Sequence, residues 1–346
     1  MNCSAITQTG QQCKRKAKVG GFCEQHAQKA LSLSKSRTPS LFEAESPDIY
    51  SSIYPINFER RVPREGMNVL RLLSWNISFD AAFLEQRLTH MLKQLREFNV
   101  DVIALQELRG DTWDVIISQL SDDYWASPVP RSKYFTGMLV SKRIMPEYPQ
   151  FQRVFFENWT NMNRDLLLVL LPKQFIRASA DLMIGTVHLE SLNSQYTRAI
   201  QMNIIESLTT DLPDVVIMGD FNFDDRSNYP NVPRSKTKLG RLDNDDLAER
   251  MPSFNDAWVL KNPATNNERL DARGGGETFN AKTQAWKNNF TSVVARYDRS
   301  MTKLTSGTFE VDSVLVLGDQ PVEYLEDGRP LFVSDHFAVE TDIIIK

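Results

Sequence analysis

Polar residues that can bind a metal or move a proton follow several apolar runs of this sequence. In the clearest case, residues 215–225, an uninterrupted and largely β-branched run delivers Asp220 and then Asn222. Such a run predicts a buried strand, and α/β folds place their chemistry at the carboxyl ends of strands. Alternation along the strand puts Asp220 and Asn222 on one face, with Phe221 and Phe223 on the other. An acid in this position can equally cap a turn, so the rest of the chain must decide.

Comparable polar residues stand at or beside the ends of other predicted strands, and so many placements are hard to explain as turn caps. The complete set is Asn76, Glu107, His188, Asp220, Asn222, Asp335 and His336. Carboxylate and amide oxygens with few nitrogens suit Mg²⁺ or Mn²⁺. No cysteine or serine is paired with a base at a spacing typical of covalent catalysis. The set predicts metal-dependent phosphoester hydrolysis, in which a carboxylate activates water and a histidine donates to the phosphoryl oxygens.

The elements that must position these residues follow from the apolar pattern. A helix is predicted over 81–98, where apolar residues recur at helical spacing, and another over 193–209. Residues 226–276 are predicted to be irregular. The predicted strands are 68–77, 101–107, 135–142, 165–172, 181–189, the run that ends before Asp220, 294–301, 310–317 and 337–344. This order of strands and helices predicts an α/β fold.

The composition is that of an intracellular soluble protein. The chain has 346 residues, of which 41% are hydrophobic and 24% charged, enough for one large core and a small appendage. No apolar run approaches the length of a membrane span, and the start Met-Asn-Cys-Ser is too polar for a secretory signal. We therefore expect a nuclear or cytoplasmic protein that is not secreted and has no membrane partner.

The N-terminal segment carries a second constellation, Cys3, Cys13, Cys23 and His26, with the spacing C-x9-C-x9-C-x2-H. Thiolate and imidazole ligands suit tetrahedral Zn²⁺, and a segment this short has no core to fold around without it. Four ligands leave no open position, so the predicted Zn²⁺ is structural. The stretch resembles the small Cys-Cys-Cys-His modules appended to assorted eukaryotic and large-virus proteins. Three unrelated cysteines are the alternative.

Charge separates this segment from the rest of the chain. The net charge is −4, yet residues 1–40 are strongly basic and the remainder is acidic. A basic head favours a nucleic-acid or protein partner, such as an import receptor, although a solvated tail gives the same pattern. Residues 29–66 are rich in Ser, Pro and charge and are predicted to be a flexible linker. The predicted domains are a zinc module over 1–28, this linker, and a catalytic domain over 67–346.

The order of motifs in the catalytic domain resembles the endonuclease/exonuclease/phosphatase superfamily. The motifs are Trp-Asn, Leu-Gln-Glu, His-Leu-Glu-Ser, Gly-Asp-x-Asn and Ser-Asp-His. The resemblance implies a four-layer α/β sandwich, in which two packed mixed β-sheets are flanked by helices. Within the superfamily, the chain is most similar to the 5′-tyrosyl-DNA phosphodiesterases. The matches are Ser-Trp-Asn-Ile (74–77), Tyr-Phe-Thr (134–136), Asn-Arg-Asp-Leu-Leu (163–167), His-Leu-Glu-Ser (188–191), Arg-Tyr-Asp-Arg (296–299) and Ser-Asp-His-Phe (334–337).

The resemblance implies roles for the residues that handle metal and water. Glu107 would bind Mg²⁺, with Asn76 hydrogen-bonding beside it. Asp220 and Asn222 would position and activate the attacking water.

The resemblance also implies which residues hold the phosphate as charge builds. These would be His336, with its ring oriented by Asp335, and His188 together with Ser191.

The resemblance also implies which residues contact the substrate. Tyr134 would line the path of the DNA end, and Arg296 of the Arg-Tyr-Asp-Arg match is assigned to substrate binding. Phe279 stands where the family has a pocket tryptophan, and Asp224 stands where it has a basic residue.

The predicted function is Mg²⁺-dependent hydrolysis of the bond between a DNA 5′ end and a tyrosine or peptide adduct, leaving a 5′ phosphate, as in DNA repair. Phenol, with a pKa of about 10, leaves more easily than a sugar alkoxide and suits a one-metal site. An abasic-site endonuclease or exonuclease of the same fold is the alternative. A phosphoinositide phosphatase is disfavoured, because Val-Ala-Arg-Tyr-Asp-Arg stands in place of Pro-[AS]-Trp-[CT]-Asp-Arg. A catalytically inactive adaptor that binds nucleic acid is the alternative from another class.

Overall fold

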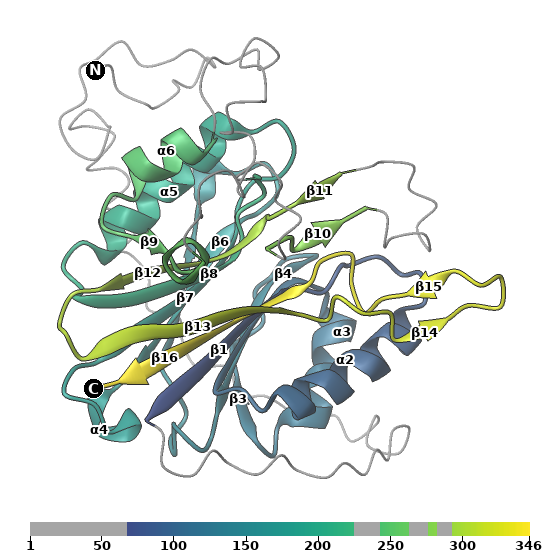
Figure 1. Cartoon of the computed structure of the whole chain (residues 1–346), viewed down its shortest axis with the longest axis horizontal. Helices are drawn as coiled ribbons and strands as arrows, with labels where there is room; N and C mark the ends of the chain where they lie inside the picture. Colours follow the sequence, from purple (N-terminus) through teal and green to yellow (C-terminus); the bar gives the residue numbers. More distant parts are fainter. Residues whose placement is uncertain (1–67, 225–242, 263–275, 282–292) are drawn as a thin grey trace.

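Two six-stranded sheets pack face to face, and helices cover the outer face of each (Figure 1). The computed structural model describes residues 68–224, 243–262, 276–281 and 293–346, and the structural statements below concern these residues. The architecture confirms the predicted four-layer α/β sandwich. The predicted zinc module and linker lie outside the described residues. No helix of the described ranges has both the length and the apolar character that a membrane span requires.

The first sheet has the strand order β13-β16-β1-β2-β4-β3 and is mixed, because β1 runs parallel to β2 and antiparallel to β16. Helices α2 and α3 lie on its outer face (Figure 1). The elements are β1 (Val69–Asn76), α2 (Leu84–Phe98), β2 (Val102–Leu108), α3 (Gly110–Leu120), β3 (Tyr124–Ala126), β4 (Phe135–Ser141), β13 (Phe309–Leu317) and β16 (Ala338–Ile345).

The second sheet has the order β5-β6-β7-β8-β12-β9, with β7 and β8 parallel and β12 antiparallel to β8. Helices α5 and α6 lie on its outer face (Figure 1). The elements are β5 (Phe151–Phe155), η1 (Glu157–Trp159), β6 (Asp165–Leu171), α4 (Lys173–Ile176), β7 (Leu182–His188), α5 (Gln195–Thr209), β8 (Asp214–Asp220), α6 (Asp243–Arg250), β9 (Asn255–Asp256), α7 (Ala257–Lys261) and β12 (Asp298–Leu304). Two short pairs complete the fold, β10 (Phe279–Asn280) with β11 (Val294–Ala295) and β14 (Glu323–Tyr324) with β15 (Pro330–Leu331).

Apolar side chains fill three interfaces between the four layers. Between the sheets, residues such as Leu72 and Val102 share one buried cluster with Ile184 and Val216. A second cluster joins the first sheet to α2 and α3, and a third joins the second sheet to α5 and α6. Strands buried on both faces read as continuous apolar runs, which is why the run before Asp220 predicts a strand correctly.

The structure corrects several predicted elements. Residues 110–120, for which no element was predicted, form α3, and the stretch predicted to be irregular contains α6, β9 and α7 in its described parts. The first helix begins at Leu84 rather than 81, because Phe83 adopts a left-handed conformation with φ of 52°. The strand predicted over 294–301 is divided into β11 and β12. At the break, the backbone N–H groups of Tyr297 and Asp298 donate to the hydroxyl of Thr278.

Candidate active site

Strand ends from both sheets meet at one edge of the sandwich. β1 and β2 bring Asn76 opposite Gln106, next to Glu107, and β7 and β8 bring His188 opposite Asp220. The close pairing of β7 and β8 requires Gly219, whose φ is +146° and where an added Cβ would lie 1.9 Å from the carbonyl oxygen of Val187. The sheet therefore holds the two strand ends in fixed register.

A continuous chain of hydrogen bonds crosses the site. The backbone N–H of Asn222 donates to Asp220 Oδ1 over 2.7 Å. Asn76 Nδ2 donates to Asp220 Oδ2 over 3.0 Å and faces Glu107 Oε1 at 3.3 Å. Glu107 Oε2 in turn accepts from the backbone N–H of Phe79 over 3.0 Å. Asn76 thus stands between the two carboxylates that the sequence predicts as water-activating and metal-binding.

Asn222 does not continue the strand as predicted. β8 ends at Asp220, and Asn222 adopts a left-handed conformation with φ of 59°. Its side-chain amide donates to the carbonyl oxygen of Leu189 over 3.0 Å. Phe221 and Phe223 are buried in the cluster under α5 and α6, where alternation placed them. A turn, rather than strand alternation, therefore sets the position of Asn222 beside Asp220.

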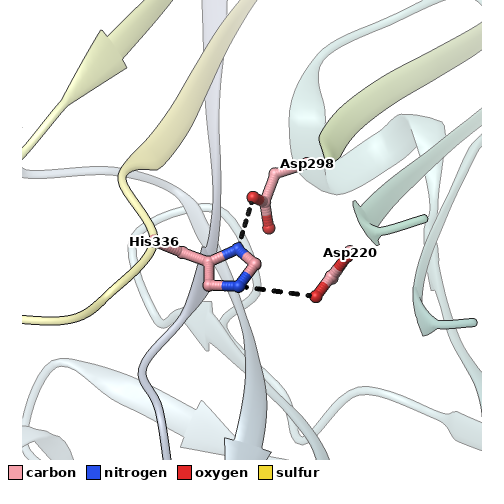
Figure 2. A group of neighbouring side chains, drawn as sticks. All are labelled: Asp220, Asp298 and His336. Atoms are coloured by element: carbon pink, nitrogen blue, oxygen red, sulfur yellow. Dashed lines mark hydrogen bonds and ion pairs between the residues drawn. The ribbon is translucent and has the colours of Figure 1, made fainter. Parts of the chain in front are cut away.

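His336 lies between two acids (Figure 2). Its Nδ1 contacts Asp298 Oδ2 at 2.8 Å, and its Nε2 lies 3.8 Å from Asp220 Oδ2. Burial opposes the charged ring, but the negative charges of Asp298, Asp220 and Asp335 outweigh it and raise the pKa of His336 to about 10. The family resemblance implied that Asp335 orients this ring. The structure corrects this assignment, because Asp298 makes the contact with the ring nitrogen.

Asp220 is a buried acid surrounded by donors. Burial raises the pKa of Asp220 to about 6, and Asp298 adds to this effect, while His336 and the hydrogen bonds from Asn76 and Asn222 work against it. At neutral pH the side chain is therefore mainly a carboxylate, with a proton affinity close to that of a histidine. This is the range in which a carboxylate serves as a general base.

His188 is held in the opposite state from His336. Its Nδ1 lies 2.6 Å from a guanidinium nitrogen of Arg164, which can only donate, so Nδ1 accepts and the proton resides on Nε2. Nε2 lies 3.4 Å from Asp220 Oδ2. Burial and the nearby positive charges of Arg164 and His336 lower the pKa of His188 well below its usual range. His188 is therefore a neutral donor directed at Asp220.

The carboxylate oxygens at Glu107 and nearby suit a hard divalent cation. Burial, together with the negative charge of Asp335, raises the pKa of Glu107. Two carboxylates that repel each other in a buried site are stabilised when a cation lies close to both. Oxygen ligands of this kind suit Mg²⁺ or Mn²⁺. Glu107 would therefore hold the ion, with Asp335 contributing negative charge nearby.

A second group of possible metal ligands is better explained as a proton-carrying network. Asp220, Asp298 and His336 present ligand atoms within 4.8 Å of one another. A histidine binds a metal through an unprotonated nitrogen. The acids around His336 raise its pKa, which favours a ring protonated on both nitrogens over one that binds a metal. We therefore assign this group to charge stabilisation and proton transfer.

Buried donors anchor the loops that carry these residues. Arg87 on α2 is 2% exposed and donates to the carbonyl oxygens of Ile77, Ser78 and Val333 over 2.7–2.8 Å. The indole N–H of Trp75 donates to the carbonyl oxygen of His336 over 3.0 Å. Arg87 therefore anchors both the loop after β1 and the loop before β16, and Trp75 also anchors the second of these loops.

Tyr134 and Phe279, both predicted to contact substrate, lie at the site. The ring of Tyr134 stacks on Phe79 at a centroid distance of 5.6 Å, with the guanidinium of Arg164 5.3 Å from its centroid. The ring of Phe279 meets the imidazole of His336 edge-on at 5.0 Å. These contacts place one aromatic side chain at the Glu107 end of the site and one at the His336 end.

The structure gives two other predicted substrate residues different partners. Arg296 is 5% exposed, and its guanidinium forms a two-pronged pair with Asp256 at 2.8 and 3.1 Å. This corrects its assignment to substrate binding, because the charged group is engaged inside the protein. The hydroxyl of Ser191 donates to the sulfur of Met162 at 3.0 Å. Asp224 accepts from the backbone N–H of Arg296 over 3.2 Å, so this acid braces the same segment.

Sequence reasoning missed Asp298, Arg164 and Arg87. Asp298 and Arg164 stand inside the quoted motifs Arg-Tyr-Asp-Arg and Asn-Arg-Asp-Leu-Leu, which was the available signal. Asp298 is the first residue of β12, and Arg164 directly precedes β6. A search for polar residues at the carboxyl ends of strands therefore passes over both. Arg87 carries no such signal, because an arginine between apolar helical positions usually faces solvent.

The fold and this site define a family of hydrolases. Residues 73–336 match the model of the endonuclease/exonuclease/phosphatase family, and the chain belongs to that family. Its members hydrolyse phosphoesters, which agrees with the carboxylates and histidines gathered at the strand ends. No protein of curated function matches the sequence at a significant level.

Solved structures of low sequence identity share the fold. TDP2 of D. rerio, solved with a single-strand DNA product, is 21% identical, with a TM-score of 0.60 over 80% of this chain and 98% of that chain. TDP2 of C. elegans is 20% identical, with a TM-score of 0.59 over 80% and 75% of the two chains. A mannosyl-6-phosphatase of Bacteroides thetaiotaomicron is 14% identical, with a TM-score of 0.54 over 80% and 100%. At these identities the likeness establishes the fold alone.

Proposed function

We propose that this protein is a Mg²⁺-dependent phosphodiesterase that releases tyrosine, or a tyrosine-containing peptide, from DNA 5′ ends and leaves a 5′ phosphate. The observation that carries the chemistry is the hydrogen-bonded chain from Asn222 through Asp220 and Asn76 to Glu107, with the imidazolium of His336 beside it. Together, these residues would supply a base for water, an oxygen ligand for the cation and a donor that stabilises charge. The choice of substrate rests on the resemblance of the motifs over 74–77, 134–136 and 188–191 to the 5′-tyrosyl-DNA phosphodiesterases.

The residues of the chain divide the reaction among them. Asp220 takes a proton from water held between its carboxylate and Asn222, and the water oxygen forms a bond to phosphorus. The bond from phosphorus to the phenolic oxygen breaks, and its electron pair leaves with tyrosine as phenolate. His336 donates to a phosphoryl oxygen as negative charge builds, while Asp298 holds its ring. Glu107 would hold Mg²⁺, which would supply positive charge to offset the charge that builds in the reaction.

Arg164 adds a reason to expect an anionic substrate. It is 5% exposed, and within the described part of the chain its side chain contacts His188, the sulfur of Met162 and the ring of Tyr134 but no carboxylate. Its Nε has no hydrogen-bond partner there. A buried cation without a counter-ion is costly, and a phosphate at the site would offset that cost. The positive charge therefore favours a phosphate-bearing ligand such as a DNA end.

The proposal can be tested by offering the purified protein three oligonucleotides side by side, with Mg²⁺ and with a chelator. They carry a 5′-phosphotyrosyl end, a 3′-phosphotyrosyl end and an abasic site. We expect the 5′ adduct to be cut fastest, with a 5′ phosphate as product and no cleavage in chelator. If abasic duplex is nicked faster than 5′ tyrosine is removed, the substrate assignment fails and only membership of the family stands.

A further inference from the structure

A fully buried acid, Glu190, lies two residues after His188 on the loop that follows β7. Its carboxylate accepts three hydrogen bonds. Oε1 accepts from the backbone N–H of Asn161 over 2.9 Å. Oε2 accepts from the hydroxyl of Thr160 over 2.8 Å and from the side-chain amide of Gln201 over 3.4 Å. The side chain of Glu190 therefore joins the loop after β7 to the turn before β6.

That turn carries Arg164. The hydroxyl of Thr160 accepts from the backbone N–H groups of Met162 over 3.1 Å and of Arg164 over 2.9 Å. Because its proton is donated to Glu190, this hydroxyl uses its donor and both of its acceptor positions. Asn163 adopts a left-handed conformation with φ of 55°, which the surrounding contacts must hold. The carboxylate and the hydroxyl together fix the backbone just before Arg164.

The main chain of Glu190 is held from the opposite side by α5. Its N–H donates to Gln201 Oε1 over 2.9 Å, and its carbonyl oxygen accepts from Arg198 over 2.7 Å. Gln201 also donates to the carbonyl oxygen of Trp159 over 3.0 Å. Helix α5 therefore holds both the loop after β7 and the segment that leads into the turn before β6.

A carboxylate is the side chain that these contacts require. Its two oxygens can only accept, and the groups that contact them here all donate. A glutamine at position 190 would turn an NH₂ group either toward the N–H of Asn161 or toward Thr160 and Gln201. Either orientation leaves one donor facing another inside the protein, which costs free energy. Glu190→Gln therefore disturbs the turn while it keeps the size of the side chain.

We propose that Glu190 is a positioning residue that acts through Thr160. The two side chains hold the turn before β6 so that the guanidinium of Arg164 meets Nδ1 of His188 at 2.6 Å. Because a guanidinium can only donate, this contact leaves the proton of His188 on Nε2, which faces Asp220 at 3.4 Å. The effect on the rate rests on the proposed function, whereas the placement of Arg164 can be measured without substrate.

The pKa of His188 reports where Arg164 lies. Three charged or titratable groups of the described residues face this ring, namely Arg164 from the turn before β6, Asp220 from β8 and His336 from the segment before β16. Burial and the positive charges of Arg164 and His336 lower the pKa of His188. Of these groups, only Arg164 is placed by the proposed path. Loss of its placement should therefore raise the pKa of His188 toward the usual range.

The test is an NMR titration of the full chain with labelled histidine, in which His188→Gln assigns the signal. We expect Glu190→Gln and Thr160→Val to raise the pKa of His188, as Arg164→Met does by removing the charge itself. Thr160→Ser keeps the hydroxyl and should leave the pKa unchanged. Glu157→Gln makes the same chemical change at an exposed acid of η1 and is the matched control.

Rates provide a second measurement on the same variants. On the 5′-tyrosyl oligonucleotide, we expect kcat/KM to fall roughly 10- to 100-fold in Glu190→Gln and in Thr160→Val, because a small displacement of a positioned group is enough for such a loss. Thr160→Ser and Glu157→Gln should stay within about 2-fold of wild type. The double variant of Glu190→Gln and Thr160→Val should lose little more than either single variant, since both changes act on one path.

An unchanged pKa of His188 in folded Glu190→Gln protein overturns the proposal. This holds even where stability or activity falls, because that result describes an acid that braces the loop without placing Arg164. If Glu190→Gln does not fold, Thr160→Val, which removes a single hydroxyl, decides in the same way. If the wild-type protein leaves the 5′-tyrosyl ester uncut, the proposed function fails, and the titration of His188 still decides whether Glu190 positions Arg164.

Discussion

The two histidines of the site are held in opposite protonation states by their neighbours. His188 faces the guanidinium of Arg164, and burial adds to this charge, so its pKa is lowered and the ring is neutral. His336 faces Asp298 and Asp220, which raise its pKa to about 10 despite its burial. Histidine thus serves as a neutral donor to Asp220 at position 188 and as a cation at position 336. Environment, rather than residue type, sets these roles.

The first prediction at this scale concerns Asp298. The imidazolium of His336 is present below its pKa of about 10 and is lost as the pH rises through it. The carboxylate of Asp220 is present above its pKa of about 6 and is lost as the pH falls through it. Asp298 raises both values, so Asp298→Asn should move both limbs of the kcat/KM profile to lower pH, by about 1–3 pH units for His336. A pH profile with unchanged limbs would show that Asp298 does not control the two groups.

The second prediction concerns the reacting groups themselves. His336→Ala should lower kcat by roughly 10²–10⁴-fold, the usual effect of removing a positioned proton donor or charge stabiliser. Asp220→Ala should lower it at least as much, because the base for water is lost. Steady-state rates on the 5′-tyrosyl oligonucleotide, with circular dichroism to check the fold, measure both effects. Near wild-type turnover in a folded variant would mean that the site is wrongly assigned.

At the scale of elements, one helix holds two active-site loops. Arg87 on α2 reaches the loop after β1 through Ile77 and Ser78 and the loop before β16 through Val333. Its positive charge is buried, and burial lowers its pKa, although Asp335, Asp80 and Glu107 act in the opposite direction. The positive charge of Arg87 therefore also offsets the negative charges of Asp335, Asp80 and Glu107.

We expect Arg87→Met to lower the free energy of unfolding by about 3 kcal/mol, because several buried carbonyl oxygens lose their donor. Activity should fall with it, since both loops loosen. Lys93→Met is the matched control on the same helix, because Lys93 is 52% exposed and lies 4.0 Å from Glu97. That change should cost less than about 1 kcal/mol. Urea unfolding of the two variants measures the difference, and equal costs would contradict the anchoring role.

The elements also show where sequence reasoning reaches its limit. Buried strands such as β8 are readable because they are continuous apolar runs, and Asp220 follows directly from the end of one. Asp298 could not be found that way, because β12 runs antiparallel to β8 and brings its first residue to the same edge. Helix α3 was missed because its Val-Ile-Ile run is β-branched, although Trp113, Ile116 and Leu120 are buried at helical spacing. The position of a residue such as Asp298 depends on pairing between strands that are distant in the sequence.

At the scale of the whole molecule, the described residues assigned to chemistry lie within one sandwich. The residues assigned to chemistry come from both sheets, and the loops that carry them are anchored inside the same body. The predicted zinc module lies outside the described residues, and its four ligands would leave no position for substrate. The module is therefore expected to act separately from the reaction.

This separation gives a prediction for the full chain. Metal analysis should find about one equivalent of zinc, lost in a Cys13→Ser, His26→Ala double variant. Hydrolysis of a short 5′-tyrosyl oligonucleotide with Mg²⁺ should continue near the wild-type rate in that variant. Unchanged zinc content would show that these residues do not form a zinc module. Lost hydrolysis would show that the catalytic domain depends on the module.

The most direct test of hydrolysis at the 5′ phosphorus is to follow the oxygen of the attacking water. The wild-type protein would hydrolyse a 5′-phosphotyrosyl oligonucleotide in ¹⁸O-labelled water, and mass spectrometry would locate the label. Attack at phosphorus with departure of phenolate places ¹⁸O on the DNA 5′ phosphate and leaves tyrosine unlabelled, and Asp220→Ala should form this product at least about 10²-fold more slowly. Release of phosphotyrosine together with a 5′-hydroxyl end, or label in the tyrosine, would contradict the direction of cleavage on which the account rests.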